Sequence, residues 1–85
     1  MKHAGPDALK ELEPLLKDLR TVSGLTEKKR GVFYRGSKAF LHFHEDPEGL
    51  FADLRLAGEG EFERCRVTTP VERKRFMALV RIGLR

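Results

Sequence analysis

The apolar residues near the start of the chain repeat with a helical period. Between residues 6 and 20 they fall on one stripe of a helical wheel: Ala8, Leu9, Leu12, Leu15, Leu16 and Leu19. Pro6 suits a first helical position, but Pro14 removes a backbone hydrogen bond in the middle of the segment. Because Pro14 lies opposite the apolar stripe, we predict one helix over Pro6–Arg20, bent around the core. The alternative is two short helices that meet at Glu13.

The central part of the chain alternates between apolar and polar residues, which predicts β-strands. Turn sequences at Gly36-Ser37, Asp46-Pro47-Glu48-Gly49 and Gly58-Glu59-Gly60 divide it into four strands, the first two over Gly31–Arg35 and Lys38–His44. One register keeps the two faces distinct across all four strands. It pairs Val32 with Leu41, Phe33 with Phe40, Tyr34 with Ala39, Arg35 with Lys38, Leu41 with Leu54, His42 with Asp53, Phe43 with Ala52, His44 with Phe51 and Ala52 with Cys65.

This register predicts one core face and one open face of the sheet. The core face carries Val32, Tyr34, Leu41, Phe43, Leu50, Ala52, Leu54, Cys65 and Val67. The open face carries Phe33, Arg35, Phe40, His42, His44, Phe51, Asp53, Arg55, Arg64 and Arg66. Aromatic rings on that scale are unusual on a solvated sheet face and are typical of an interface or a binding site.

A second helix begins at Thr69-Pro70-Val71-Glu72, which matches a capping box with proline at the first helical position. Its apolar stripe contains Phe76, Leu79, Val80 and Leu84. The element order is therefore α-β-β-β-β-α. We predict a single α+β domain over residues 1–85, a two-layer sandwich with both helices on one face of a four-stranded antiparallel meander.

Composition narrows the class of protein. No apolar run approaches the length of a membrane span, and the first residues lack the apolar region of a secretory signal. We therefore expect a cytoplasmic protein without a membrane partner. The chain contains no Asn, Gln or Trp and is rich in charged residues, which is typical of thermophilic proteins. The single cysteine, Cys65, excludes an internal disulfide and is interpreted as a small core residue.

The net charge of +4 is unevenly distributed along the chain. Residues 28–38 carry five positive charges and no negative ones, whereas residues 45–63 carry seven negative charges against one positive. Residues 64–85 carry seven positive charges against one negative. A basic surplus permits an anionic partner such as nucleic acid, and a mixed solvated surface gives the same totals.

Two interpretations of the open face involve its aromatic rings. In the first, Phe33, Phe40 and Phe51 are buried against a second copy of the chain, giving a homodimer. In the second, these rings stack single-stranded bases, while arginines neutralise the nucleic-acid backbone. The arginines concerned are Arg35, Arg55, Arg64 and Arg66. The acidic turn near Asp46 opposes that partner, and no RNP motif, helix-turn-helix or zinc-finger spacing is present.

The third interpretation is a metal site. His42 and His44 are two residues apart on a strand, so both imidazoles leave the same face. Asp53 is expected across from His42, where it orients the ring or supplies a third ligand. Two histidines and one carboxylate hold zinc or iron in proteins. The plainer alternative is a structural hydrogen bond between His42 and Asp53.

The run from Gly31 to Arg55 resembles the central meander of the small bacterial proteins called YjbR or MmcQ-like. The matching residues are Gly36, Lys38, Phe40, Asp46, Pro47 and Leu50, and the similarity spans residues 8–67. It implies a helix followed by an antiparallel meander, and it implies nucleic-acid binding, which has been suggested for that fold. No cofactor is implied.

From the sequence we therefore expect a binding domain that acts through the open sheet face. Nucleic acid is the first partner to test; a metal or small molecule bound through His42, His44 and Asp53 is the alternative, and a structural homodimer is the third. No serine, threonine or cysteine has a base at a spacing that indicates nucleophilic catalysis, so no catalytic residue is predicted.

Overall fold

The protein has an α+β fold, as predicted. The structure, a computed structural model, describes residues 1–56 and 60–84. Gly58 and Glu59 of the predicted turn lie outside the described residues. The strands of the described residues are β1 (Lys2–His3), β2 (Thr26–Lys29), β3 (Val32–Arg35), β4 (Lys38–Asp46), β5 (Gly49–Leu54) and β6 (Glu63–Arg66). The helices are α1 (Pro6–Glu11), α2 (Glu13–Arg20) and α3 (Pro70–Gly83).

The sheet is wider than the predicted four strands. Its order is β2-β3-β4-β5-β6, every described pairing is antiparallel, and β1 adds to β4 beside the end of β3. The sequence of β2 is Thr-Glu-Lys-Lys and three of its four residues are exposed. It therefore lacks the alternation that reveals a half-buried strand. β1 spans two residues and gives no periodic signal.

The register of the β4–β5 hairpin matches the prediction. Leu41 pairs with Leu54, His42 with Asp53, and His44 with Phe51. The β5–β6 register also matches, with Asp53 opposite Arg64. Both apolar residues of the first pair are fully buried, at 0% exposure. The predicted sidedness of Leu41–His44 and of β5 is therefore confirmed.

The β3–β4 register matches the prediction next to the turn and differs by one residue beyond it. Arg35 pairs with Lys38 and Tyr34 with Ala39 as predicted, but the register shifts between Phe33 and Tyr34, so that Phe33 pairs with Leu41. A shift of one residue moves side chains to the opposite face. Phe33 and Phe40 are therefore core residues, 1% and 3% exposed, and not part of the open face. Val32 and Tyr34, predicted in the core, are only half-buried.

The predicted first helix is divided in two. α1 ends at Glu11, α2 begins at Glu13, and Leu12 lies between them. Pro14, in the first turn of α2, has no N–H to donate to the preceding turn. The alternative of two short helices is thus confirmed over a single bent helix. The apolar stripe still continues through the break, since Leu12, Leu15 and Leu16 are all buried.

The helix predicted after Thr69, which is α3, begins as predicted. The Thr69 side chain accepts a hydrogen bond from the backbone of Glu72, and the Glu72 carboxylate accepts one from the Thr69 backbone.

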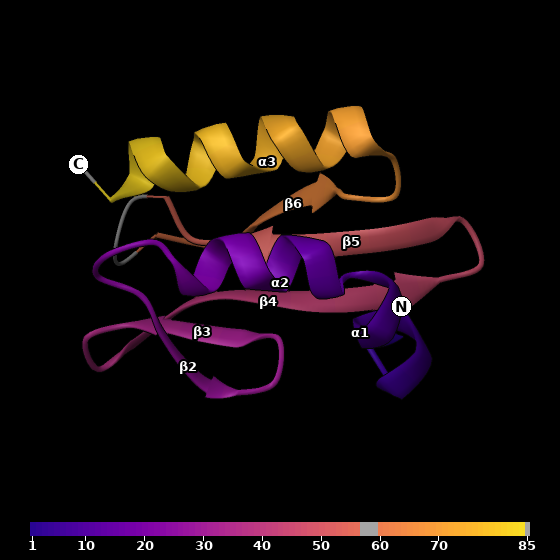
Figure 1. The fold of residues 1–85 in the computed structure, drawn as a ribbon, viewed down its shortest axis with the longest axis horizontal. Helices are drawn as coiled ribbons and strands as arrows, with labels where there is room; N and C mark the ends of the chain where they lie inside the picture. Colours follow the sequence, from indigo (N-terminus) through magenta and orange to yellow (C-terminus); the bar gives the residue numbers. More distant parts are fainter. Residues whose placement is uncertain (57–59, 85) are drawn as a thin grey trace.

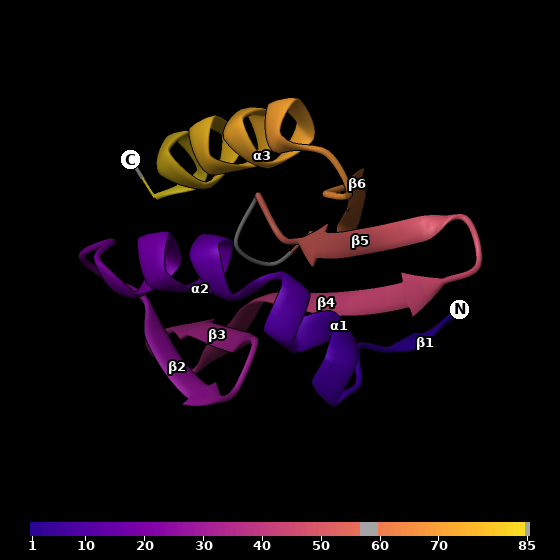
Figure 2. The same ribbon diagram turned by 45° about the vertical axis from the view of Figure 1, so that its right-hand side comes forward.

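Figures 1 and 2 show α2 and α3 over the same side of the sheet. Within the described residues, no helix has both the length and the apolar character needed to cross a membrane. The buried apolar residues are Ala8, Leu12, Leu15, Leu16, Leu19, Phe33, Phe40, Leu41, Phe43, Leu50, Ala52, Leu54, Val67, Phe76, Met77 and Val80.

Candidate metal centre

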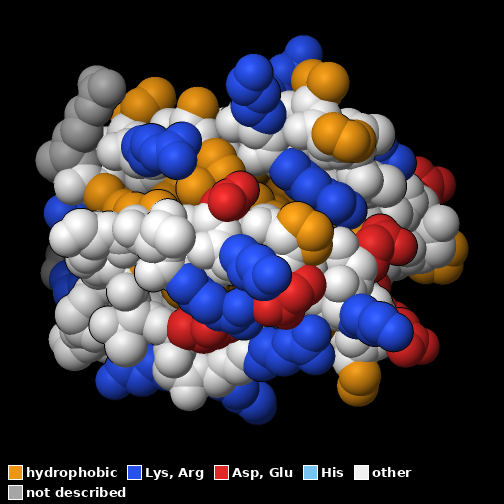
Figure 3. Space-filling view, in the orientation of Figure 1, with side chains coloured by type: hydrophobic (Ala, Val, Ile, Leu, Met, Phe, Trp, Pro, Cys, Tyr) orange, Lys and Arg blue, Asp and Glu red, His pale blue; other side chains and the backbone are white. Residues whose placement is uncertain are grey.

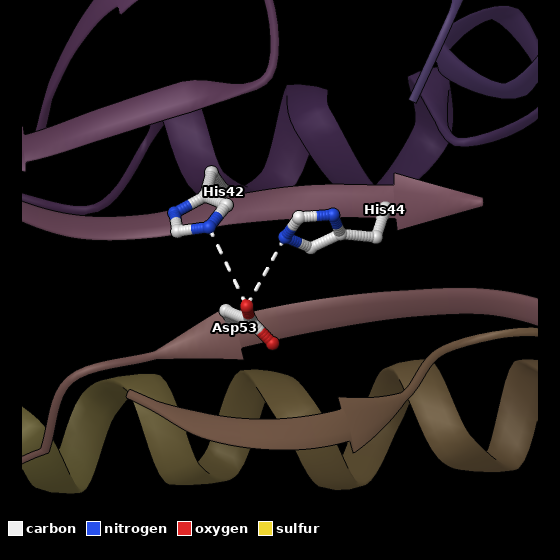
Figure 4. A group of neighbouring side chains, drawn as sticks. All are labelled: His42, His44 and Asp53. Carbon is white, nitrogen blue, oxygen red and sulfur yellow. Dashed lines mark ion pairs between the residues drawn. The ribbon is translucent and has the colours of Figure 1, made fainter. Parts of the chain in front are cut away.

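The β4–β5 hairpin brings three polar side chains together on the face opposite its core leucines. His42 and His44 alternate with the core residues Leu41 and Phe43 along β4, so their side chains leave the other face. Asp53 lies directly across from His42 on β5. Figure 4 shows the three side chains converging in front of these two strands. The prediction that His42, His44 and Asp53 lie together is confirmed.

A single carboxylate oxygen faces both imidazoles. Asp53 Oδ2 lies 3.5 Å from His42 Nε2 and 3.1 Å from His44 Nε2 (Figure 4). One ligand atom from each of the three residues lies within 4.8 Å of the other two. Two ring nitrogens and one oxygen thus surround one point between the strands.

Arg64 holds the carboxylate in this orientation. Its Nε donates to Asp53 Oδ1 at 2.8 Å, and its Nη2 donates to Oδ2 at 2.9 Å. These hydrogen bonds lower the pKa of Asp53 against the opposing effect of burial. Asp53 is therefore ionised at neutral pH although it is only 8% exposed. The strand pairing that places Arg64 opposite Asp53 was predicted from the sequence.

The two histidines differ in burial, His42 being half-buried and His44 buried. Burial lowers the pKa of His42, with the Asp53 carboxylate opposing this effect, so the ring is neutral at pH 7. His44 is 8% exposed, and neither of its ring nitrogens has a hydrogen-bond partner among the described residues. Its Nε2 is close to Asp53, but the approach is too poorly aligned for a hydrogen bond. A buried polar group without a partner is uncommon and needs an explanation.

His3 also belongs to this cluster, although the sequence analysis did not single it out. In β1 it pairs with His44, and the two rings stack with centroids 4.7 Å apart. The His3 ring lies 5.8 Å from that of His42. Pairing of a distant two-residue strand leaves no local pattern. The sequence offered one signal, namely that the chain contains only three histidines. In the structure the rings of all three lie next to one another.

Phe62 and Arg55 complete the opposite side of the cluster. The Phe62 ring meets the His42 ring edge-on, with centroids 4.9 Å apart. The Arg55 guanidinium lies 4.3 Å from the centre of the Phe62 ring. Arg55 was predicted on this face, whereas Phe62 was not identified. Arg55 Nε is buried and has no hydrogen-bond partner in the described part of the chain.

The remaining predicted site residues are not brought into the cluster. Phe33 and Phe40 lie in the core, which corrects their assignment to a stacking platform or dimer contact. Phe51 stays half-buried on the outer face, opposite Arg66. Arg66 forms an ion pair with Glu72 and donates to the backbone of Glu48. The positive charge of Arg66 is therefore partly neutralised by a carboxylate of the same domain.

A groove on the helical side of the molecule has different chemistry. It has a volume of about 450 Å³ and lies between α2 and α3. Figure 3 shows apolar side chains with lysines and arginines around them on this side. None of the described buried polar atoms that lack a partner belongs to it. Its lining residues are Pro14, Leu15, Asp18, Pro70, Arg73, Lys74, Met77 and Arg81.

Cys65 does not contribute to the candidate centre. It is half-buried and packs against the core, as expected from the sequence. Burial raises the pKa of its thiol, so the thiolate that binds metals is disfavoured.

Comparisons of the chain with protein-family models, with curated proteins and with solved structures find no match. The resemblance to the YjbR or MmcQ-like proteins therefore stays a prediction. The site has to be interpreted from its own geometry.

Proposed function

We propose that this domain binds a transition-metal ion, with zinc as the first candidate, through His42, His44 and Asp53. The observation that carries the proposal is His44, whose buried ring nitrogens have no hydrogen-bond partner among the described residues. A cation held by Nε2 would satisfy one of them. The same nitrogen faces the carboxylate oxygen that also faces His42.

The spacing of the ligand atoms supports this proposal. Zinc bonds of about 2.0–2.2 Å in a tetrahedron place neighbouring ligand atoms about 3.3–3.6 Å apart. The two nitrogen–oxygen separations, 3.5 Å and 3.1 Å, are close to this spacing. The three ligand atoms lie within 4.8 Å of one another, so a zinc ion between them would draw the side chains of His42, His44 and Asp53 together.

The protonation states also favour a cation. A metal ligand must present a neutral imidazole or an ionised carboxylate. Burial keeps His42 neutral, and Arg64 keeps Asp53 ionised. Arg64 further acts as an outer partner that fixes the carboxylate, as such partners do in known metal sites. Imidazole nitrogens with a carboxylate oxygen suit zinc, iron and nickel better than magnesium.

The structure gives less support to nucleic-acid binding through this face. Two of the three rings predicted to stack bases, Phe33 and Phe40, are core residues. Of the arginines, Arg64 is engaged by Asp53 and Arg66 by Glu72. Nucleic-acid binding and a homodimer through the outer face stay predictions without a supporting contact.

Equilibrium dialysis of the untagged chain against zinc tests the proposal. We expect one zinc ion per chain, retained against a large excess of magnesium. His44→Ala and His42→Ala should each lose this zinc, and Asp53→Asn should bind it more weakly because the ionised oxygen is gone.

Phe51→Ala is the matched control, since Phe51 is half-buried on the same strand and face as Asp53 but contributes no ligand. This variant should retain the zinc. Failure of the wild-type chain to retain zinc, or equal retention by His42→Ala and His44→Ala, would overturn the proposal.

A further inference from the structure

We infer that His3 is the fourth protein ligand of this centre, so that metal binding fastens the N-terminal strand β1 to β4. The inference rests on the proposed function, because it assigns an additional ligand to the same site. With four protein ligands the site is closed and structural; with three it keeps a position open for water or substrate. His3 therefore decides which kind of centre this is.

The register of β1 places His3 beside the other two histidines. His3 pairs with His44 in an antiparallel register, and the two imidazoles stack with centroids 4.7 Å apart. The ring of His42 lies 5.8 Å from that of His3. All three imidazoles thus occupy one patch of the outer face, beside the carboxylate of Asp53.

Contacts of Lys2 and of the two residues after β1 hold this strand in place without involving the His3 ring. The backbone N–H of Ala4 donates to Phe43 O at 3.0 Å. That of Gly5 donates to Glu45 Oε2 at 2.8 Å, and Lys2 Nζ lies 3.2 Å from Glu45 Oε1. The Cα of His3 is therefore fixed next to the site before any ligand binds.

The His3 side chain is exposed, and its ring stacks on that of His44 at an interplanar angle of 28°. Ligation therefore requires the His3 side chain to rotate about its own bonds, which an exposed residue does at little cost. On the side of Phe62, which contacts His42 and Arg55, these two described neighbours offer no metal ligand, whereas His3 offers an imidazole nitrogen.

The affinity of the His3→Ala variant for zinc tests this assignment. Loss of an outer partner alone typically weakens metal binding by about 10- to 100-fold, so loss of a ligand should weaken it by at least that factor. A cobalt-substituted sample gives a second measurement. The visible absorption of cobalt should shift when His3 is replaced, because a water oxygen then takes the position of an imidazole nitrogen.

Hydrogen exchange reports on the consequence for β1. Zinc should slow exchange of the Ala4 amide in the wild-type chain and leave it unchanged in His3→Ala. Lys2→Ala is the matched control, because it removes the exposed ion pair with Glu45 and keeps all four ligands. It should bind zinc as the wild type does.

Three outcomes would overturn the inference, and they are distinguishable. If the wild type binds no zinc, the proposed function fails and the inference fails with it. If His3→Ala binds zinc as tightly as the wild type, with the same cobalt spectrum, the inference alone fails and the centre is open. If Lys2→Ala and His3→Ala weaken binding equally, the position of β1 matters and ligation by His3 is rejected.

Discussion

The two faces of the β4–β5 hairpin are made of the same two strands but are stabilised differently. On one face Leu41 and Leu54 are directly paired and fully buried in the hydrophobic core. On the other, His42 and Asp53 are directly paired, and His44 is buried without a partner for its ring nitrogens among the described residues. The core face contains apolar side chains that need no hydrogen-bond partner. The opposite face contains buried nitrogen atoms that lack one.

Burial has opposite effects on the free energy of unfolding at the two faces. Burying apolar area stabilises the core face by about 25 cal/mol per Å². Burying a polar atom without a hydrogen bond costs about 1–3 kcal/mol. A chain that keeps His44 in such a position is therefore less stable than it would be with an apolar residue there. We interpret this cost as the consequence of a binding role.

The largest expected effect concerns Phe40, which the sequence placed on the outer face and the structure places in the core. Phe40→Ala should lower the free energy of unfolding by about 3–5 kcal/mol, because it leaves a cavity beneath α3. Phe51→Ala, on the outer face, should cost clearly less. Urea denaturation of both variants measures the difference. Equal, small losses would show that Phe40 is not a core residue.

The next effect compares the stability lost by substitutions on the two faces of β4. His44→Leu removes the buried atoms without partners, so the metal-free chain should keep its stability or gain about 1 kcal/mol. Leu41→Ala, on the opposite face of the same strand, should lose about 2–5 kcal/mol. Thermal unfolding in the presence of a chelator provides the comparison. A large loss in His44→Leu would mean that the imidazole stabilises the fold directly.

A smaller effect follows from the neutral state of His42 in the metal-free chain. Burial places the folded-state pKa of His42 below its ordinary value of 6.5. Between those two values the unfolded chain binds more protons than the folded one, so stability falls as the pH decreases through this range. His42→Leu should flatten that slope. A slope unchanged in the variant, measured by denaturation at several pH values, would contradict the assignment.

Sequence reasoning succeeded where alternation and turn chemistry were strong. The β4–β5 register follows from the alternation of Leu41, His42 and Phe43 together with the Asp46–Gly49 turn. The start of α3 follows from the capping box at Thr69. Both signals are local, so a single chain is enough to interpret them.

The errors arose where one extra residue shifts the register of a strand, or where the pairing partner of a strand is distant in the sequence. The register shift near Phe33 turned Phe33 and Phe40 into the core, and no local pattern marks such an irregularity. The pairing of His3 with His44 spans about half of the chain. Two of the ten residues predicted on the open face, Phe33 on β3 and Phe40 on β4, therefore lie in the core. His42, His44 and Asp53 lie together as predicted.

The most direct test of the central claim is the nuclear magnetic resonance spectrum of the imidazole nitrogens during a zinc titration of the whole chain. We predict that the Nε2 signals of His42 and His44 shift together and that the change is complete at one equivalent of zinc. Unchanged signals for these two nitrogens at a saturating zinc concentration would contradict the claim that this face of the sheet binds a metal ion.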